Sequence, residues 1–177
     1  IAGLLLQDVI ADSLRLVELI AWTQVGFALL LFVADRVGMT IRKIDHLRLS
    51  DAILVGLAQM LALVPGTSRS GITMTAGRFL GMERSEAARF SFLIAIPTVG
   101  GAGLLGAWEL YKFGSMELGI DALITVGLSF FSSLFALAVL MAWIRRQSFT
   151  IFVVYRLLLG CFLLWLVYSG TLATLTF

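Results

Sequence analysis

Long apolar stretches alternate with short polar connections along most of the chain. A helix needs about 20 mostly apolar residues to cross a bilayer. Two apolar segments, 51–64 and 71–81, are too short for this. Four others are long enough, and they cover 16–34, 87–108, 120–143 and 150–168. The pattern therefore predicts four membrane spans and, between the first two, a pair of half-length helices.

The two half-length helices are separated by a polar turn that begins with Pro65 and Gly66. Proline ends a helix because its ring removes a backbone donor and clashes with the preceding turn. We expect 51–81 to form a re-entrant hairpin, which is tolerated at membrane depth when it packs in protein or lines a wet cavity. The alternative is a single span kinked at Pro65.

Composition supports a membrane protein. Of the 177 residues, 60% are hydrophobic and 14% are charged, whereas soluble domains carry about 25% charged residues. The predicted fold is an all-α polytopic membrane protein, with 1–177 as a single membrane-embedded unit. The net charge of +2 comes without a basic run interleaved with aromatic residues, so nucleic acid is not an expected partner.

The basic residues predict the orientation. Cytoplasmic loops carry an excess of lysine and arginine, and the segment 109–121 is net acidic. If the hairpin returns to its own side, the Arg-rich connections all lie on one face, which we expect to be cytoplasmic. The segment 109–121 and the C-terminus would then be outside. The basic residues in question are Arg36, Arg42, Lys43, Arg48, Arg84, Arg145 and Arg146.

The turn VPGTSRSGIT (64–73) carries the candidate chemistry. The second half-helix is expected to start near Ser70 or Gly71, and its first turn offers unpaired N–H groups and a partial positive charge to an anion such as phosphate. Arg69 adds a planar cation that matches phosphate oxygens, and Ser68, Ser70 and Thr73 add hydroxyls. The alternative is that the hydroxyls only cap the helix while Arg69 reaches toward water.

Other polar positions are less specific. Gln59, on the first half-helix, could point toward the turn or join a helix–helix hydrogen bond. Arg78 is expected to pair with Glu83 or Glu86. Arg156, inside the last span, needs a buried partner or a route to the surface. His46, the only histidine, lies in a charged loop, so a histidine-based metal site or a Ser-His-Asp triad is not expected.

The segment 58–98 resembles the C-terminal half of the undecaprenyl-diphosphate phosphatases, also called bacitracin-resistance proteins. That family has a motif Pro-Gly-x-Ser-Arg-Ser-x-x-Thr, a run Glu-Ala-x-x-Phe-Ser-Phe-Leu, and a Tyr-Arg pair in the last span. Here the motif is met by Pro65, Gly66, Ser68, Arg69, Ser70 and Thr73, the run by 86–93, and the pair by Tyr155 and Arg156.

The resemblance implies two inverted repeats, each with a re-entrant hairpin, in the bacterial cytoplasmic membrane. It implies removal of the terminal phosphate of undecaprenyl diphosphate, which recycles the cell-wall lipid carrier, with a divalent cation such as Mg²⁺ or Ca²⁺. On this basis Arg69, Ser68 and Ser70 are the expected catalytic residues. The expected substrate-binding residues are Gly66, Thr73, Gln59 and Gly71.

The chain departs from the family in one respect. The family's first motif, a Glu-x-x-x-Glu pair followed by Pro-Val-Ser-Ser-Thr-Gly-His, has no match here. Those residues carry the acidic metal ligands and the proposed nucleophile or base, so we assign no metal ligand in this chain. We expect the chain to be a partial one, mainly the second repeat. A second copy or a separate N-terminal half would then be its partner.

Two further functional classes share features with this sequence. Inverted repeats with broken helices are also transporter architecture, so a polyprenyl-phosphate transporter, flippase or non-hydrolytic binding protein is the alternative function. Lipid phosphatases of the acid-phosphatase type place a histidine after their Ser-Arg pair, with five residues between. Here that position is Thr75, and this class is excluded.

Overall fold

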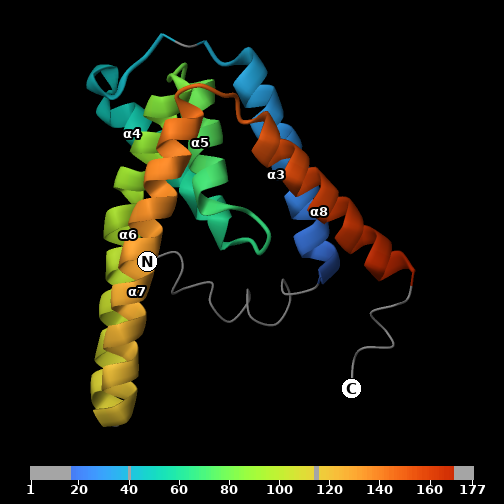
Figure 1. The fold of residues 1–177 in the computed structure, drawn as a ribbon. Coiled ribbons are helices and arrows are strands. Elements are labelled where there is room, and N and C mark those ends of the chain that lie inside the picture. The colour runs from blue at the N-terminus through green and yellow to red at the C-terminus, as the bar shows by residue number, and fades with distance from the viewer. Residues whose placement is uncertain (1–16, 40, 114–115, 170–177) are drawn as a thin grey trace.

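The protein is all-helical over the part of the chain that the structure, a computed structural model, describes: residues 17–39, 41–113 and 116–169. Single 3₁₀ turns cover Ile44–His46 (η1) and Leu61–Leu63 (η2). The helices, shown in Figure 1, are α3 (Val17–Val37), α4 (Leu49–Met60), α5 (Arg69–Phe79), α6 (Arg84–Phe113), α7 (Met116–Ile144) and α8 (Thr150–Tyr168). The predicted all-α fold is confirmed.

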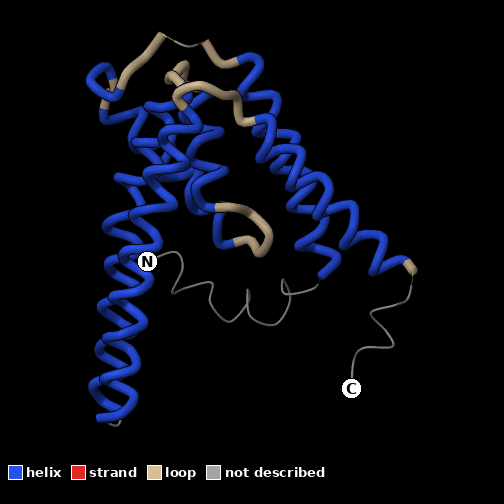
Figure 2. The backbone as a smooth tube through the Cα atoms, viewed as in Figure 1, coloured by secondary structure: helices blue, strands red, loops and turns tan. Residues whose placement is uncertain are grey.

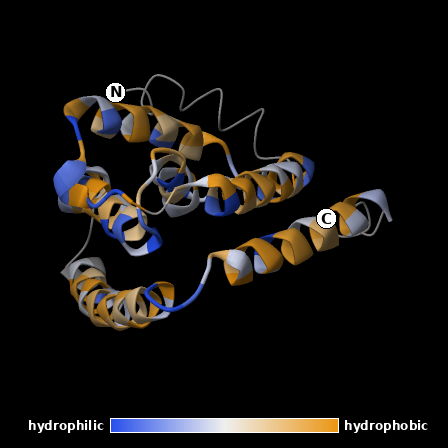
Figure 3. Ribbon diagram, turned by 90° about the horizontal axis from the view of Figure 1, so that it is seen from above, coloured by the Kyte–Doolittle hydropathy of each residue, from blue (hydrophilic) through white to orange (hydrophobic). Residues whose placement is uncertain are grey.

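Helices α3, α6, α7 and α8 are long and apolar enough to cross a membrane. Their large apolar side chains face outward: Leu104, Leu123 and Phe135 are 75%, 74% and 74% exposed. Figure 3 shows hydrophobic residues along most of the helical ribbon. Such a surface belongs in lipid rather than water. The four predicted spans of this multi-pass membrane protein are confirmed, except that Leu16 lies outside the described residues.

Helices α4 and α5 form the predicted hairpin rather than one kinked span. They pack against each other, and the segments at their outer ends are also joined. The backbone N–H of Arg42 donates to the carbonyl of Gly81 at 3.0 Å, and that of Glu83 donates to the carbonyl of Arg42 at 3.0 Å. The chain therefore enters and leaves the hairpin at the same end of the molecule, and the tip turns back partway along the long helices (Figure 2).

Helix α5 is central because it contacts both α3 and α6. In Figure 1, the pair α3 and α8 and the pair α6 and α7 lie on either side of the hairpin. A buried apolar cluster joins the two pairs beneath the polar connections. It contains Ala28, Leu31, Met74, Ala88, Ile144, Phe149 and Val153.

The hairpin begins at an ion pair. The Asp51 carboxylate, in the first turn of α4, accepts a hydrogen bond from the backbone N–H of Arg48 at 3.0 Å and pairs with the Arg42 guanidinium. The pKa of Asp51 lies below its ordinary value, mainly because of the hydrogen bond from the Arg48 backbone and secondly because of the hydrogen bond from the Arg42 side chain. The ionised Asp51 carboxylate therefore stabilises the folded protein at neutral pH, and this stabilisation is lost as the pH falls through the lowered pKa.

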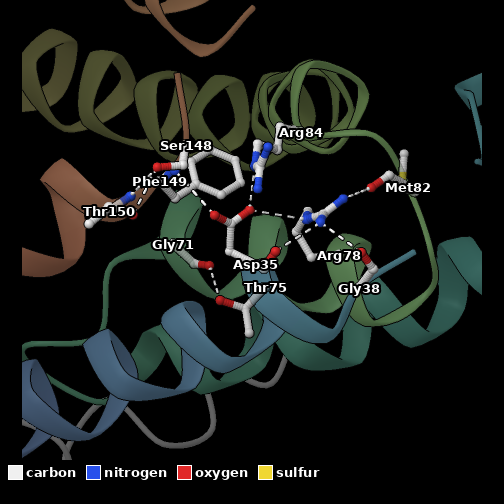
Figure 4. A network of polar contacts seen from close by, with 10 residues as sticks. All are labelled: Asp35, Gly38, Gly71, Thr75, Arg78, Met82, Arg84, Ser148, Phe149 and Thr150. Carbon is white, nitrogen blue, oxygen red and sulfur yellow. Dashed lines mark hydrogen bonds and ion pairs between the residues drawn. The ribbon is translucent and has the colours of Figure 1, made fainter. Parts of the chain in front are cut away.

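A buried carboxylate, Asp35, joins four helices near the same end (Figure 4). Its Oδ1 accepts a hydrogen bond from Arg84 Nε at 2.6 Å and lies 3.4 Å from Arg78 Nε. Its Oδ2 accepts one from the backbone N–H of Phe149 at 3.4 Å. Asp35 thus connects the end of α3 to α5, to the start of α6 and to the residue before α8.

Arg78 is buried at 1% exposure, and its other donors reach backbone carbonyls. It donates to the carbonyls of Asp35 at 3.1 Å, of Gly38 at 2.9 Å, and of Met82. The prediction that Arg78 pairs with Glu83 or Glu86 is wrong. Because α5 packs against the end of α3, Arg78 meets Asp35 first, and Glu86 instead accepts a hydrogen bond from the backbone N–H of Ile44 at 3.1 Å.

The Asp35 network and the Arg42 backbone bonds also bring the connection 41–48, which is rich in basic residues, close to Gly81, to Glu83 and to the basic connection 145–149. The far ends of α6 and α7 lie at the opposite end of the molecule (Figure 1). This arrangement agrees with the charge pattern and with a hairpin that returns to its own side. The C-terminal residues 170–177 lie outside the described residues, so their predicted location stays a prediction.

We predict that Asp35→Ala destabilises the protein by about 3–5 kcal/mol, because it leaves the buried Arg78 guanidinium without its counterion. The measurement is thermal unfolding of the detergent-solubilised protein. Asp45→Ala, at an exposed position in the loop before α4, is the control and should unfold like the wild type. Equal unfolding temperatures for both variants would contradict the role of Asp35.

Candidate functional site

The candidate site lies at the tip of the hairpin, where α5 begins. Ser68 is the N-cap: its backbone is extended, and its Oγ accepts a hydrogen bond from the backbone N–H of Gly71 at 3.2 Å. This cap starts α5 at Arg69, slightly earlier than the predicted Ser70 or Gly71. The Oγ atoms of Ser68 and Ser70 lie 3.2 Å apart. Two hydroxyls therefore stand at the positive end of a helix, where an anion is favoured.

Helices α3 and α8 hold the carbonyl groups of the turn. Thr23 Oγ1, on α3, donates to the carbonyl of Pro65 at 2.7 Å. On α8, Arg156 Nη2 donates to the carbonyl of Gly66 at 2.9 Å, and its Nε donates to Gln24 Oε1 at 2.8 Å. The tip is thus fixed from outside the hairpin.

Two glycines allow these close approaches. Gly66 has a φ of +86°, which favours glycine, and a Cβ there would lie 2.1 Å from Thr23 Oγ1. A Cβ at Gly160 would lie 2.6 Å from Val25 Cγ2, so Gly160 lets α8 pack directly on α3. Gly66, predicted to bind substrate, is placed at the turn by these steric requirements.

Ser68, Ser70 and Gly71 line one cavity of about 210 Å³ together with Arg156. Its other lining residues are Leu31, Met74, Leu140, Ile144, Phe149, Phe152 and Tyr155. Arg156 was not among the predicted site residues. Two features of the sequence pointed to Arg156: an arginine inside an apolar span, and the Tyr-Arg pair. The sequence did not show its partners, because Gln24 and Gly66 are far from Arg156 in the chain.

The structure places Arg69 beside a different cavity. Its Nη1 donates to Thr98 Oγ1 at 3.1 Å and to the carbonyl of Ala95 at 3.5 Å, both on α6. The side chain lines an open groove of about 670 Å³ between α6 and α7. Among the described residues, no carboxylate lies within ion-pair distance of Arg69. Arg69 and the two serines therefore share the turn but line separate spaces.

Thr73 and Gln59 do not line the cavity of Ser68 and Ser70. Thr73 is 1% exposed, and its Oγ1 lies 2.6 Å from Ser91 Oγ, between α5 and α6. The Oε1 of Gln59 is buried and has no hydrogen-bond partner among the described residues. Thr73 thus joins α5 to α6, whereas Gln59 keeps an unused acceptor on α4.

A site for a divalent cation would need several ligand side chains close together. Among the described residues, no three His, Cys, Asp or Glu side chains are placed to hold one. The hairpin tip offers hydroxyls and guanidinium groups, whereas Mg²⁺ and Ca²⁺ prefer carboxylate and carbonyl oxygens. The described residues therefore do not fit the expected divalent cation, and no chemical step is assigned to it.

Comparison with known proteins identifies relatives of the whole chain. The chain is 48% identical over 151 residues to undecaprenyl-diphosphatase 1 of Rhodospirillum rubrum, covering 85% of this chain and 54% of that protein. It is 43% identical to the undecaprenyl-diphosphatase of Erythrobacter litoralis, covering 90% and 55%. For that of Roseobacter denitrificans the identity is 44%, covering 96% and 64%.

The chain thus spans between about half and just under two-thirds of the length of these curated relatives. The family model described as bacitracin resistance protein BacA matches residues 1–162. This match includes the whole hairpin, the serines and Arg69 at its tip, and Arg156. The chain belongs to the BacA family of bacitracin resistance proteins.

Proposed function

We propose that the protein carrying this chain hydrolyses undecaprenyl diphosphate to undecaprenyl phosphate and inorganic phosphate, which recycles the cell-wall lipid carrier. The observation that carries the proposal is the start of α5, where Ser68, Ser70 and Arg69 stand at a helix N-terminus among apolar helices. The relatives' name, undecaprenyl-diphosphatase, supports the same substrate.

In this reaction, water adds to the terminal phosphorus and the P–O–P bond breaks. The lipid monophosphate leaves with the bridging oxygen, and inorganic phosphate is released. Catalysis of phosphoryl transfer depends mainly on positioning and on stabilising the charge of the phosphoryl oxygens. In the proposal, Ser68, Ser70 and the unpaired N–H groups of the first turn of α5 bind these oxygens, and Arg69 supplies a permanent positive charge from the α6 side of the turn.

The remaining predictions about the site belong to the same proposal. Gly66 and Gly71 keep the turn and the cavity open. Thr73 joins α5 to α6, Gln59 keeps an unused acceptor on α4, and substrate binding by these two residues stays a prediction. A divalent cation, and a partner in the form of a second copy or an N-terminal half, stay predictions from the family resemblance. They enter no step of the reaction given above.

The location is proposed to be the bacterial cytoplasmic membrane, with the Arg-rich connections on the cytoplasmic side. The support is the positive-inside rule together with the grouping of these connections at one end of the molecule. The C-terminus and the far ends of α6 and α7 are then outside.

We predict that Arg69→Ala lowers phosphate release from undecaprenyl diphosphate by at least about 100-fold, as expected for the loss of one charge-stabilising donor. Release is measured with the complete gene product in detergent. Arg89→Ala, at an exposed position on α6, is the control and should remain active. Wild-type release by Arg69→Ala would remove Arg69 from the site. A wild-type protein that binds the lipid but releases no phosphate would support transport instead.

The orientation predicts the labelling of single cysteines. Cys161 is first replaced by serine, and cysteine is then introduced at Lys43 or at Glu109, both exposed. In intact spheroplasts a membrane-impermeant maleimide should label Glu109→Cys, while Lys43→Cys should react only after lysis. The reverse pattern would show that the Arg-rich end faces outward.

A further inference from the structure

Arg156 is a buried cation without a counterion among the described residues. It lies within α8, is 8% exposed, and has no carboxylate within ion-pair distance in that part of the chain. Its Nε and Nη2 donate to neutral acceptors, Gln24 Oε1 and the carbonyl of Gly66. A buried arginine in a membrane helix is costly unless a negative group accompanies it, and it marks a functional site by default.

The remaining nitrogen of Arg156 faces the cavity. Nη1 has no hydrogen-bond partner among the described residues, and it lies 3.0 Å from the position that a Cβ at Gly71 would occupy. The same point is 3.1 Å from Ser68 Cβ and 3.3 Å from Ser68 Oγ. The missing side chain of Gly71 therefore keeps a space open between the guanidinium group and the Ser68 hydroxyl.

This space is large enough for a ligand. The cavity of about 210 Å³ far exceeds the roughly 10–15 Å³ that one water molecule requires. Its polar lining comes from Ser68 and Ser70 at the start of α5 and from Arg156 on α8. All of these groups favour a negatively charged ligand with several oxygens.

We propose a phosphoryl-binding subsite made of Arg156 Nη1, the hydroxyls of Ser68 and Ser70, and the unpaired N–H groups in the first turn of α5. This subsite does not include Arg69. The proposal rests on the proposed function when the ligand is the diphosphate lipid, of which this subsite holds one phosphoryl group. The same chemistry binds inorganic phosphate, the product of hydrolysis. Arg69, on the α6 side of the turn, acts separately.

The geometry assigns Gln24 a positioning role. Two of the three guanidinium nitrogens are held by fixed acceptors, Gln24 Oε1 and the carbonyl of Gly66, so the third is directed into the cavity. A lysine ammonium has no planar fork and cannot reproduce these three directions. If Arg156 had only a structural role, it would connect the hairpin tip to α8 without binding a ligand. The two roles differ in their effect on phosphate binding.

The test compares Gly71→Ala, Arg156→Lys and the exposed control Arg89→Gln in the complete gene product in detergent. Gly71→Ala adds no charge and fills the space beside Nη1 with a methyl group, and alanine is the better helix former. Three quantities are measured: the unfolding temperature, the kinetics of phosphate release, and inhibition by inorganic phosphate and by undecaprenyl phosphate.

We expect Gly71→Ala to keep the wild-type unfolding temperature while its kcat/KM falls about 10- to 100-fold, in line with the loss of a hydrogen bond to a charged group. Its inhibition constant for inorganic phosphate should rise about tenfold or more. Arg156→Lys should show the same kinetic losses, and Arg89→Gln none. Inhibition by undecaprenyl phosphate weakens in parallel if the subsite holds the lipid's phosphoryl group. If only the inorganic phosphate effect changes, the subsite belongs to the released product.

Wild-type inhibition constants in both Gly71→Ala and Arg156→Lys would overturn the subsite and leave Arg156 a structural residue. Failure of the proposed function is a different result, in which the wild-type protein releases no phosphate. In that event the readout is the rise in unfolding temperature with inorganic phosphate. A rise in the wild type that is lost in Gly71→Ala would support the subsite, and no rise in either would overturn it.

Discussion

The carbonyl groups at the hairpin tip must receive hydrogen bonds, because the turn lies among apolar helices where water is scarce. Thr23 of α3 and Arg156 of α8 provide the donors for Pro65 and Gly66. This requirement fixes the tip against the α3–α8 pair and directs the start of α5 toward a cavity. The helix N-terminus that gives the site its chemistry is therefore placed by the same contacts that make the turn tolerable in a membrane.

At the other end of the hairpin, ion pairs hold the helices together. Asp35 lies between Arg78 and Arg84, so these two arginines share a buried carboxylate. Arg69 and Arg156, at the tip, have no such partner among the described residues. Among the described residues, the buried Arg78 is therefore paired with a carboxylate, whereas the buried Arg156 and the half-buried Arg69 at the tip are not. An anionic ligand at the tip can supply the missing charge.

Membership of the BacA family and the geometry of the tip lead to the same class of ligand. The family relatives are diphosphatases by name, and the tip combines hydroxyls, helix amides and guanidinium groups, which suit phosphoryl oxygens. Under the proposed function, the two arginines would act in separate places. Arg69 faces the groove between α6 and α7, and Arg156 faces the cavity of Ser68 and Ser70.

The sequence by itself determined the local features: four spans, a hairpin broken at Pro65, and a polar turn at Ser68–Ser70 that is proposed to bind an anion. Each depends on residues close together in the chain, namely an apolar run, a proline or a helix cap. Only the tertiary structure decided that Arg78 pairs with Asp35, that Arg69 reaches α6, and that Arg156 completes the cavity. These pairings join residues far apart in the chain, and the packing of α5 between α3 and α6 selects them among several partners of suitable charge.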